Sequence, residues 1–368
     1  SDQMLQIAWK WLLQNHPHDS ICGCSTDQVH QDMLYRFSQC RQLAECVASE
    51  SLVNLAASAP GSLGEREIRL AVFNPLSVAR DEVLEFDVEI PVGWPEFGEF
   101  FGYESKPAFR IFDADGGEVV YQRLAVRRNI VRPRLRDTKY PQAFRFNVVR
   151  VAARLAIPAM GFASLKVVGP SSSEGTEGVL PTRHLAVRGL RTAHASMENE
   201  FLSVEIQAGG ILILTDKTTG QTYGNLNVFQ DDADIGDGWN HGPTTNRRDV
   251  LSGAGQAQIE IVCDTPLMTT FVVRQTLTLP ESFDVRDHRR AESRVPLIIE
   301  SRISLRAGAR VLDIETQISN TADDHRLRVM FSTDVTAETY LADAPFDVVE
   351  RRIALREDNH DYREMEVE

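Results

Sequence analysis

The sequence predicts a mainly β protein with an α-helical segment at its N-terminal end. Up to residue 58, apolar side chains recur at helical spacing, whereas from Ile68 onward short runs of β-branched and aromatic residues alternate with polar ones. A stretch rich in Ser, Gly and Glu, Pro170 to Thr182, divides these runs into two groups. We therefore expect a helical-bundle remnant, a β-sandwich and a larger antiparallel β-domain.

The helical segment, which we place at residues 1–58, contains two predicted helices. Residues 4–13 are mostly apolar and contain no Pro or Gly, and they predict a largely buried helix that ends before Pro17. The second helix is predicted to start near Ser25, where the letters STDQ form a capping-box pattern. Apolar residues spaced alternately by four and three positions extend it over about 30 residues, as in a helix packed along a bundle seam.

Two β-domains are predicted after the helices. Six runs, among them IRLAVFNP and AFRFNVVRVAA, occupy residues 66–169 and predict a β-sandwich of about 100 residues. Residues 170–182 are predicted to be a linker, because they lack apolar periodicity. Residues 183–368 carry further strands, such as TTFVVRQTLTL, and form the larger domain. Because neither end carries a turn or cap signal, we expect a piece of a longer protein whose last domain is truncated.

Composition limits the partners that the chain can bind. The 368 residues carry a formal net charge of -14, which disfavours nucleic acid and anionic membrane surfaces but is compatible with a neutral ligand such as a sugar. No apolar run approaches the roughly 18 residues of a membrane span. The five cysteines are an odd number and a poor disulfide framework, so that a reducing, cytoplasmic location is predicted. The sequence leaves open whether the chain forms a homo-oligomer.

The segment HPHDSICGC is the densest cluster of metal-binding residue types in the sequence. His16, His18, Asp19, Cys22 and Cys24 lie within it, between the two predicted helices. Because we expect the chain around the proline to be extended, the two imidazole rings are predicted to project from one side. Zinc requires four protein ligands in a closed site or three in an open one, and Cys-x-Cys is tighter than the usual spacing. Spacing alone leaves three interpretations open: a self-contained metal site, a hydrogen-bonded polar turn, or a site completed by residues elsewhere.

A second candidate site is the segment DIGDGWNHGP, residues 234–243. Its glycines permit a tight loop, and Trp239 with Asp237 has the aromatic and polar composition of a sugar-binding wall. The alternative is a loop between strands in which the tryptophan anchors the sandwich, because large aromatic residues are usually packing residues.

Two basic stretches are predicted to be structural. In DDHRLRV, Arg326 and Arg328 are two positions apart on a predicted strand, so that they share a face, and we expect them to form ion pairs with acidic residues. The run RRNIVRPRLR, residues 127–136, is predicted to be a solvated loop because the chain as a whole is acidic.

The segment AWKWLLQNHPHDSICGCSTDQVHQDM resembles the helical-domain signature of glycoside hydrolase family 38, the zinc-dependent retaining α-mannosidases, and especially its bacterial members. That signature is an apolar helix, a His-Asp pair, a small-residue turn and a Ser or Thr that opens a long helix. LAVFNPLSVARDEVLEF, MENEFLSVEIQAGGILILTDKTTGQTY and NTADDHRLRVMFSTDV resemble later family segments in the same order. The resemblance covers nearly the whole chain.

The resemblance implies a fold and a set of site residues. The larger β-domain is implied to be a β-supersandwich of the galactose-mutarotase type. His18 matches the histidine that binds zinc, and Asp19 matches the aspartate that contacts the sugar hydroxyls, although it could equally orient the histidine. Trp239 is implied to contact the terminal sugar, and Asp237, a candidate from the composition of the same segment, is expected to bind the substrate with it. The catalytic nucleophile and the other zinc ligands belong to an N-terminal catalytic α/β domain, so that no catalytic residue is assigned here.

These expectations imply that the chain alone is inactive and needs the N-terminal domain to hydrolyse an α-mannoside. Two alternatives stay open. One is a related hydrolase of a small charged mannoside such as mannosylglycerate. The other is a non-catalytic carbohydrate-binding or structural module. His16, Cys22 and Cys24 have no assigned role.

Overall fold

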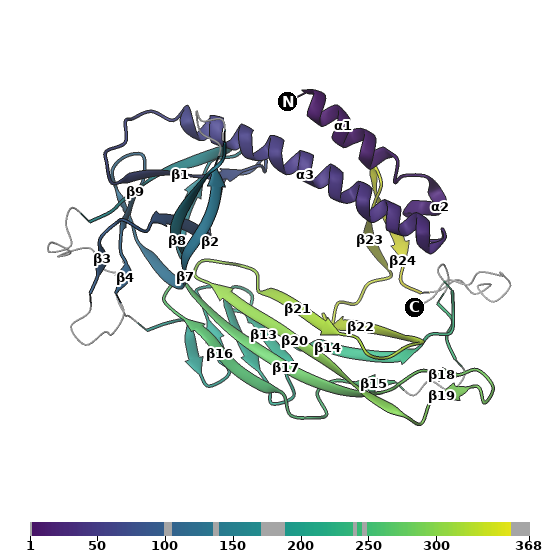
Figure 1. Cartoon of the computed structure of the whole chain (residues 1–368). Coiled ribbons are helices and arrows are strands. Elements are labelled where there is room, and N and C mark those ends of the chain that lie inside the picture. The colour runs from purple at the N-terminus through teal and green to yellow at the C-terminus, as the bar shows by residue number, and fades with distance from the viewer. Residues whose placement is uncertain are drawn as a thin grey trace. The chain divides into compact units, whose positions relative to one another are not determined.

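The computed structural model describes residues 2–98, 105–134, 140–170, 188–237, 241–244 and 249–354. In these residues three helices precede a series of antiparallel sheets, which confirms the predicted mainly β class with an N-terminal helical segment (Figure 1). The chain divides into two compact units, Ser1–Val187 with Thr265–Leu267, and Arg188–Asp264 with Met268–Glu368. The finer division at 58, 66, 170 and 183 stays a prediction, and most of the proposed linker lies outside the described residues.

Helix α1 (Asp2–Leu13) lies alongside the much longer α3 (Asp27–Ala57), with the short α2 (His18–Ile21) between them (Figure 1). The prediction that the first helix is largely buried is wrong, since Ala8 is its only buried residue. Trp9 is 58% exposed and Leu13 is 57% exposed. The physical reason is that, within the described part of the chain, α1 packs mainly against one helix and covers only one of its faces. No helix in the described residues is long and apolar enough to span a membrane.

Helix α3 has the predicted length but not the predicted cap. Its 31 residues contain neither Pro nor Gly, so that nothing interrupts the helical hydrogen bonds. Its N-cap is Thr26, which makes no side-chain capping hydrogen bond, and the expected capping box from Ser25 is therefore wrong. The C-terminal end is tied to the first strand, because the Arg69 guanidinium donates hydrogen bonds to the carbonyl groups of Ala59 and Pro60 at 2.8 and 3.1 Å.

Two sheets pack face to face in the first unit. One has the order β1-β9-β5-β6 and the other the order β2-β8-β7, and a further small pair is formed by β3 and β4. The β2–β8 pairing runs through twelve residues, from Arg80 opposite Ile157 to Pro91 opposite Phe146. The strands are β1 (Glu67–Asn74), β2 (Arg80–Pro91), β3 (Glu96–Phe97), β4 (Lys106–Pro107), β5 (Arg110–Phe112), β6 (Glu118–Val119), β7 (Tyr121–Arg134), β8 (Gln142–Ile157) and β9 (Gly161–Val168).

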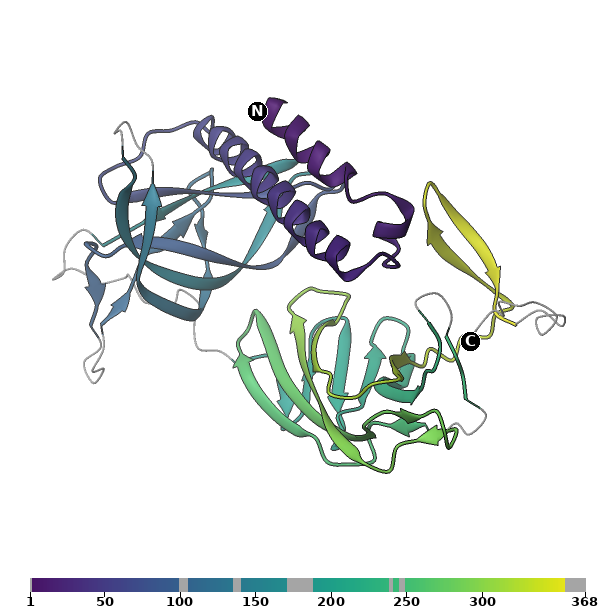
Figure 2. The same ribbon diagram turned by 45° about the vertical axis from the view of Figure 1, so that its right-hand side comes forward.

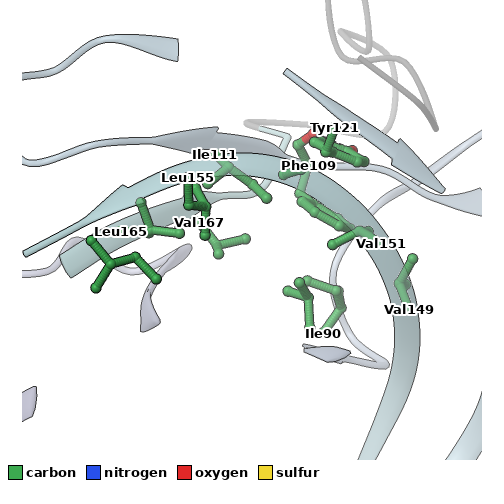
Figure 3. Close-up of a cluster of buried hydrophobic side chains, with 12 residues drawn as sticks. Ile90, Phe109, Ile111, Tyr121, Val149, Val151, Leu155, Leu165 and Val167 are labelled. Atoms are coloured by element: carbon green, nitrogen blue, oxygen red, sulfur yellow. Dashed lines mark hydrogen bonds between the residues drawn. The ribbon is translucent and has the colours of Figure 1, made fainter. Parts of the chain in front are cut away.

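The core of this sandwich is apolar and close-packed. Leu155 on β8 lies beside Val167 on β9, whereas Val151, also on β8, lies toward Phe109 (Figure 3). On β9 the buried Leu165 and Val167 flank the exposed Lys166, as a period-two pattern predicts, whereas β8 is buried continuously at residues 146–149 and 151–153. The buried tyrosine of the cluster, Tyr121, satisfies its hydroxyl within the core.

The basic run at residues 127–136 forms a strand as far as Arg134, not the predicted loop. Strand β7 extends through it at the edge of its sheet, where Pro133 is tolerated because an edge strand need not donate every hydrogen bond. Arg127 pairs with Asp87 at 2.7 Å and Arg128 with Glu96 at 2.8 Å. The charges are therefore neutralised across the sheet, which lets a basic sequence form a strand.

The second unit contains a seven-stranded sheet and a four-stranded sheet (Figure 2). The first has the order β10-β11-β12-β13-β14-β15 with β22 paired to β14, and the second the order β16-β17-β20-β21. Their cores include Met197, Leu212, Phe271 and Ile303. The strands are β10 (Arg191–Ala193), β11 (Ser196–Glu198), β12 (Leu202–Ile206), β13 (Leu212–Asp216), β14 (Thr222–Ala233), β15 (Val250–Leu251), β16 (Gln258–Asp264), β17 (Met268–Pro280), β18 (Phe283–Asp284), β19 (Arg289–Arg290), β20 (Arg294–Arg306), β21 (Asp313–Ser319), β22 (His325–Phe331), β23 (Thr339–Ala344) and β24 (Asp347–Arg352).

Candidate functional site

His18 and Asp19 form an exposed pair at the start of α2. Pro17 precedes the helix with φ -51° and ψ 139°, and its carbonyl accepts hydrogen bonds from the backbone of Ser20 and Ile21 at 2.9 and 3.0 Å. His18 therefore begins a helical turn, and the expectation of an extended segment is wrong at this residue. His18 Nε2 lies 2.9 Å from Asp19 Oδ1, with the two side chains 93% and 65% exposed.

A buried asparagine attaches the segment before this pair to helix α3. Asn15 is fully buried, and its Nδ2 donates a hydrogen bond to the carbonyl of Met33 on α3 at 3.0 Å. Asn15 thus fixes the chain immediately before the exposed His16 to the long helix. The result is a polar turn with an anchored base.

Cys22 and Cys24 complete the turn after α2. Their sulfur atoms lie 3.1 Å apart, and the Cys24 thiol also donates a hydrogen bond to the Asp19 carbonyl at 3.5 Å. Hydrogen bonding to Cys22 is the largest cause that raises the pKa of Cys24 to about 11, followed by burial and by the charges of Cys22 and Asp19. The two cysteines, to which the sequence assigned no role, therefore interact with each other.

The donor set at this turn falls short of a zinc site. Zinc takes three or four protein ligands, whereas the described residues contain no group of three or more His, Cys, Asp or Glu side chains placed to hold a metal ion. His18 and Asp19 thus fit only as part of a site whose other ligands come from outside the described residues.

The second candidate segment, residues 234–243, is a loop with a closed base. The Asp234 carboxylate accepts hydrogen bonds from the backbone of Gly236 and Gly242, both at 2.9 Å, and the Ile235 amide donates to the Gly242 carbonyl at 3.0 Å. Asp237 is exposed on this loop. Trp239 lies outside the described residues, so that its predicted role stays a prediction.

His241 and two aspartates support the base of the loop. The Nδ1 atom of His241 lies 3.1 Å from Asp234 Oδ2, and its Nε2 atom lies 3.9 Å from Asp232 Oδ2. The imidazole is only 7% exposed. Burial alone would raise the pKa of Asp234, but hydrogen bonds from the amides of Gly242 and Gly236 and the interaction with His241 outweigh it and lower that pKa. The Asp234 carboxylate is consequently held in its charged form.

Arg326 and Arg328 do share a face of β22, as predicted. In the β14–β22 pairing Asp232 stands opposite Arg326, and their side chains form an ion pair at 2.8 Å. Arg328 donates to the side-chain oxygen of Gln230 at 3.1 Å. Burial works to raise the pKa of Asp232, yet the hydrogen bond and the charge of Arg326, with smaller contributions from Arg328 and His241, lower it.

A buried cluster beside this pair was missed by the sequence analysis. The fully buried carboxylate of Asp231 accepts from Arg290 at 2.5 Å and contacts His325 Nδ1 at 2.7 Å. The other ring nitrogen of His325 lies 3.0 Å from the side-chain oxygen of Asn320. The sequence does contain a signal for this cluster. Residues 231–234 are rich in aspartate, and the β22 segment His325–Phe331 is basic, which indicates that the two could pair. Each of these four residues has at least one partner, although Arg290 Nη2 is buried without one, and we interpret this cluster as structural.

The predicted site residues divide between the two units. His18 and Asp19 lie in the first unit, and Asp237 lies in the second. Within the first unit His18 and Asp19 are in contact. The predicted site residues therefore do not form a complete site within either unit.

Comparisons with known proteins show what the chain is similar to. The model of the glycosyl hydrolases family 38 C-terminal domain matches residues 197–367. A curated protein of Halalkalibacterium halodurans named "Putative mannosylglycerate hydrolase" is 27% identical over 369 residues, which cover 93% of this chain and 40% of the relative. The chain thus spans less than half the length of this relative.

Solved structures agree with this match over almost the whole chain. An alpha-mannosidase from Enterococcus faecalis V583 superposes with a TM-score of 0.84 at 26% identity, covering 97% of this chain and 42% of that one. A glycosyl hydrolase family 38 protein from Enterococcus faecalis superposes with a TM-score of 0.79 at 27% identity, covering 94% and 42%. The chain therefore resembles glycosyl hydrolase family 38 proteins over almost its whole length, and residues 197–367 match the C-terminal domain of that family.

Proposed function

We propose that the chain is part of a zinc-dependent retaining α-mannosidase that hydrolyses terminal α-mannosides. In this proposal His18 is a zinc ligand and Asp19 contacts the sugar hydroxyls. The observation that carries the proposal is the exposed but anchored His18–Asp19 pair, which is short of the ligands that a metal needs. Contact with a carboxylate is also what orients a metal-binding histidine in proteins generally.

The remaining ligands and the nucleophile are proposed to come from an N-terminal catalytic α/β domain. Two observations support this division. The chain covers only 40 to 42% of the relatives that it matches. Moreover, α1 and α3 expose large apolar side chains, among them Trp9 at 58% and Leu34 at 70%, and a hollow on α1 is lined by Trp9 and Leu13. Apolar surface of this kind marks a contact with another domain.

Asp237 and Trp239 are proposed to line the pocket for the terminal sugar. Support comes from the closed base of their loop, in which Asp234 and Gly242 fix the two ends while Asp237 stays exposed. Bound zinc would act as a Lewis acid toward the sugar hydroxyls. A retaining glycosidase also needs two carboxyl groups about 5 Å apart, and neither is assigned to this chain. We therefore expect the isolated chain to be inactive.

The test uses the full-length protein with two histidine variants. His18→Ala should lose bound zinc, measured by elemental analysis, and most turnover of an aryl α-mannoside. His16→Ala is the matched control, because His16 is equally an exposed histidine beside Pro17 but has no assigned role. Zinc retained at the wild-type level in His18→Ala would show that His18 is not a ligand. Turnover by the rigorously purified isolated chain would contradict the division of the site.

A second candidate is a hydrolase of mannosylglycerate. It is favoured by one observation, the name of the Halalkalibacterium halodurans relative that aligns with 93% of this chain. The two candidates differ in the charge of the leaving group. Comparing kcat/KM of the full-length protein for a neutral aryl α-mannoside and for mannosylglycerate therefore separates them. A full-length protein that binds sugar but turns over neither substrate would instead support the non-catalytic module.

A further inference from the structure

The thiols of Cys22 and Cys24 lie side by side on the surface of the first unit. Both residues are exposed, and their sulfur atoms are 3.1 Å apart. A disulfide bond is about 2.05 Å long, so that the two sulfurs need to approach by only about 1 Å to bond. None of the five cysteines, all of which lie in the described residues, is in a disulfide in this structure.

The turn has room for this approach. Gly23 separates the two cysteines with φ +86°, a conformation that glycine adopts without strain. Apart from Gly23 itself and the two adjoining cysteines, no residue has a heavy atom within 4 Å of the position that a side chain on Gly23 would occupy. The backbone between the two sulfurs can thus adjust without displacing a packed neighbour.

Cys46, the other exposed cysteine of this unit, has no adjacent thiol among the described residues. Cys46 lies on α3, where its sulfur contacts Glu50 Oε1 at 3.9 Å. Cys40 is six positions before it, and residues six apart point to different sides of a helix. Cys46 therefore provides an internal control, an exposed thiol without an adjacent thiol.

We propose that Cys22 and Cys24 are a redox-responsive pair that a low-molecular-weight disulfide oxidises to an intramolecular disulfide. The Cys22 sulfur attacks the small disulfide, forming a mixed disulfide and releasing one small thiol. The Cys24 sulfur then attacks the Cys22 sulfur of the mixed disulfide and releases the second small thiol. Two protein thiols are oxidised and one small disulfide is reduced to two thiols. In a reducing compartment, exposed pairs of this kind act as reversible sensors.

Oxidation alters the surroundings of Asp19. The reduced Cys24 thiol donates a hydrogen bond to the Asp19 carbonyl at 3.5 Å, and its sulfur lies 3.8 Å from Asp19 Oδ1. A disulfide has no S–H group, so that this donor is lost. Oxidation of the pair therefore changes the hydrogen bonding of Asp19, which contacts His18. The oxidation itself does not depend on the proposed hydrolase activity.

The test incubates the reduced chain with oxidised glutathione, blocks the remaining thiols by alkylation and weighs the peptides. The peptide with Cys22 and Cys24 should be lighter by two hydrogen atoms and carry no alkyl group, and dithiothreitol should reverse this. The Cys46 peptide should appear alkylated or as a glutathione adduct. Glutathione adducts on Cys22 or Cys24 that persist as they do on Cys46, or full alkylation of both, would overturn the proposal.

Two serine variants sharpen the result. In Cys24→Ser the resolving thiol is absent, and a glutathione adduct should accumulate on Cys22 several-fold above the wild-type level. Cys46→Ser should form the intramolecular disulfide as the wild type does. Circular dichroism establishes that both variants are folded. Equal adduct levels on Cys22 in the wild type and in Cys24→Ser would contradict the role of Cys24.

Discussion

Arg326 binds the carboxylate of Asp232 through two hydrogen bonds, from Nε to Oδ1 at 3.2 Å and from Nη2 to Oδ2 at 2.8 Å. The two residues stand opposite each other in the β14–β22 pairing. Asp232 is 2% exposed and Arg326 is 20% exposed. A two-point contact of a guanidinium with a carboxylate is both stronger and more directional than a single ion pair.

The first prediction is that Arg326→Met strongly destabilises the second unit. The variant leaves the Asp232 carboxylate buried without its main partner, since Arg328 lies 3.9 Å away. Removing one member of a buried pair costs about 3 to 5 kcal/mol, and the partial exposure of Arg326 places the expected loss near the lower end, about 3 kcal/mol. Urea denaturation followed by circular dichroism measures the loss.

An exposed pair on the same unit provides the control. Arg274 Nε lies 2.6 Å from Glu300 Oε2, but the two side chains are 45% and 40% exposed. Arg274→Met should therefore lower the free energy of unfolding by less than about 1 kcal/mol. Equal losses for the two variants would show that burial of Asp232 does not make its pairing important.

The second prediction concerns acid unfolding. The pKa values of Asp232 and Asp234 are lowered in the folded chain, because hydrogen bonds and neighbouring charges outweigh burial. An unfolded aspartate titrates near pH 3.9. Groups with a lowered folded pKa contribute stability that is present above the unfolded pKa and is lost as the pH falls through the folded pKa. The free energy of unfolding should thus be maximal above about pH 5 and should fall below about pH 4.

Asp234→Asn tests the contribution of one of these carboxylates. The amide oxygen can still accept hydrogen bonds from Gly236 and Gly242, but it carries no charge and does not titrate. The variant should be less stable than the wild type at pH 7 and should lose less stability between pH 5 and pH 3. Asp323→Asn, at an exposed position of the same unit, should keep the wild-type profile. Parallel pH profiles for Asp234→Asn and the wild type would contradict the prediction.

The strands and the long helix were predictable because they depend on local patterns. The run AFRFNVVRVAA is rich in β-branched and aromatic residues, which favour strands, and it lies in β8. The absence of Pro and Gly from residues 27–57 likewise allowed α3. The exposure of individual side chains was harder to predict. The apolar sequence of α1 indicates that burial of its surface is favourable, but not which residues another element covers. Which neighbour covers Trp9 depends on the tertiary structure.

The charge clusters were only half predictable. That Arg326 and Arg328 share a face follows from strand geometry alone. The identity of their partners depends on register, which places Asp232 opposite Arg326 across 94 positions of sequence. Long separations, of 59 and 94 positions, also hid the contacts of Asp231 with Arg290 and His325. The basic run at residues 127–136 was wrongly predicted to be a loop for a similar reason. It forms part of β7 because acidic residues of neighbouring strands pair with its arginines.

The third prediction is that Gly242→Ala disrupts the base of the loop at residues 234–243. A Cβ atom on Gly242 would lie 2.4 Å from the backbone nitrogen of Gly236 and 2.7 Å from the carbonyl carbon of Ile235. Backbone atoms cannot yield as a flexible side chain can, so that the hydrogen bond between Ile235 and Gly242 must break. The expected loss is about 1 to 3 kcal/mol in the urea unfolding of the second unit.

Gly224→Ala is the matched control for this substitution. Nothing lies within 4 Å of the position of its added Cβ atom, and its φ is not in the left-handed region. The substitution should therefore be neutral, or stabilising by up to about 1 kcal/mol, because alanine restricts the unfolded chain. If both alanine variants unfold at the wild-type urea concentration, the close approach at Gly242 has no energetic consequence.

The fourth prediction concerns the hydroxyl group in the core of the sandwich. Tyr121 is fully buried, stacks on Phe109 with ring centroids 4.8 Å apart and donates its hydroxyl to the Phe109 carbonyl at 2.7 Å. Tyr121→Phe keeps the ring but removes the donor, which leaves a buried carbonyl lone pair unsatisfied. The free energy of unfolding of the first unit should fall by about 1 to 3 kcal/mol, as measured by urea denaturation.

Tyr35→Phe separates the effect of the hydrogen bond from that of the ring. Tyr35 on α3 is 59% exposed and meets Trp11 edge to face, with ring centroids 5.8 Å apart. Its phenylalanine variant keeps this ring contact, and its hydroxyl is solvated in both the folded and the unfolded chain. We expect a change within about 0.5 kcal/mol. An equal loss for the two phenylalanine variants would mean that the Phe109 carbonyl finds another donor, and that the hydroxyl of Tyr121 contributes specificity to the core but little stability.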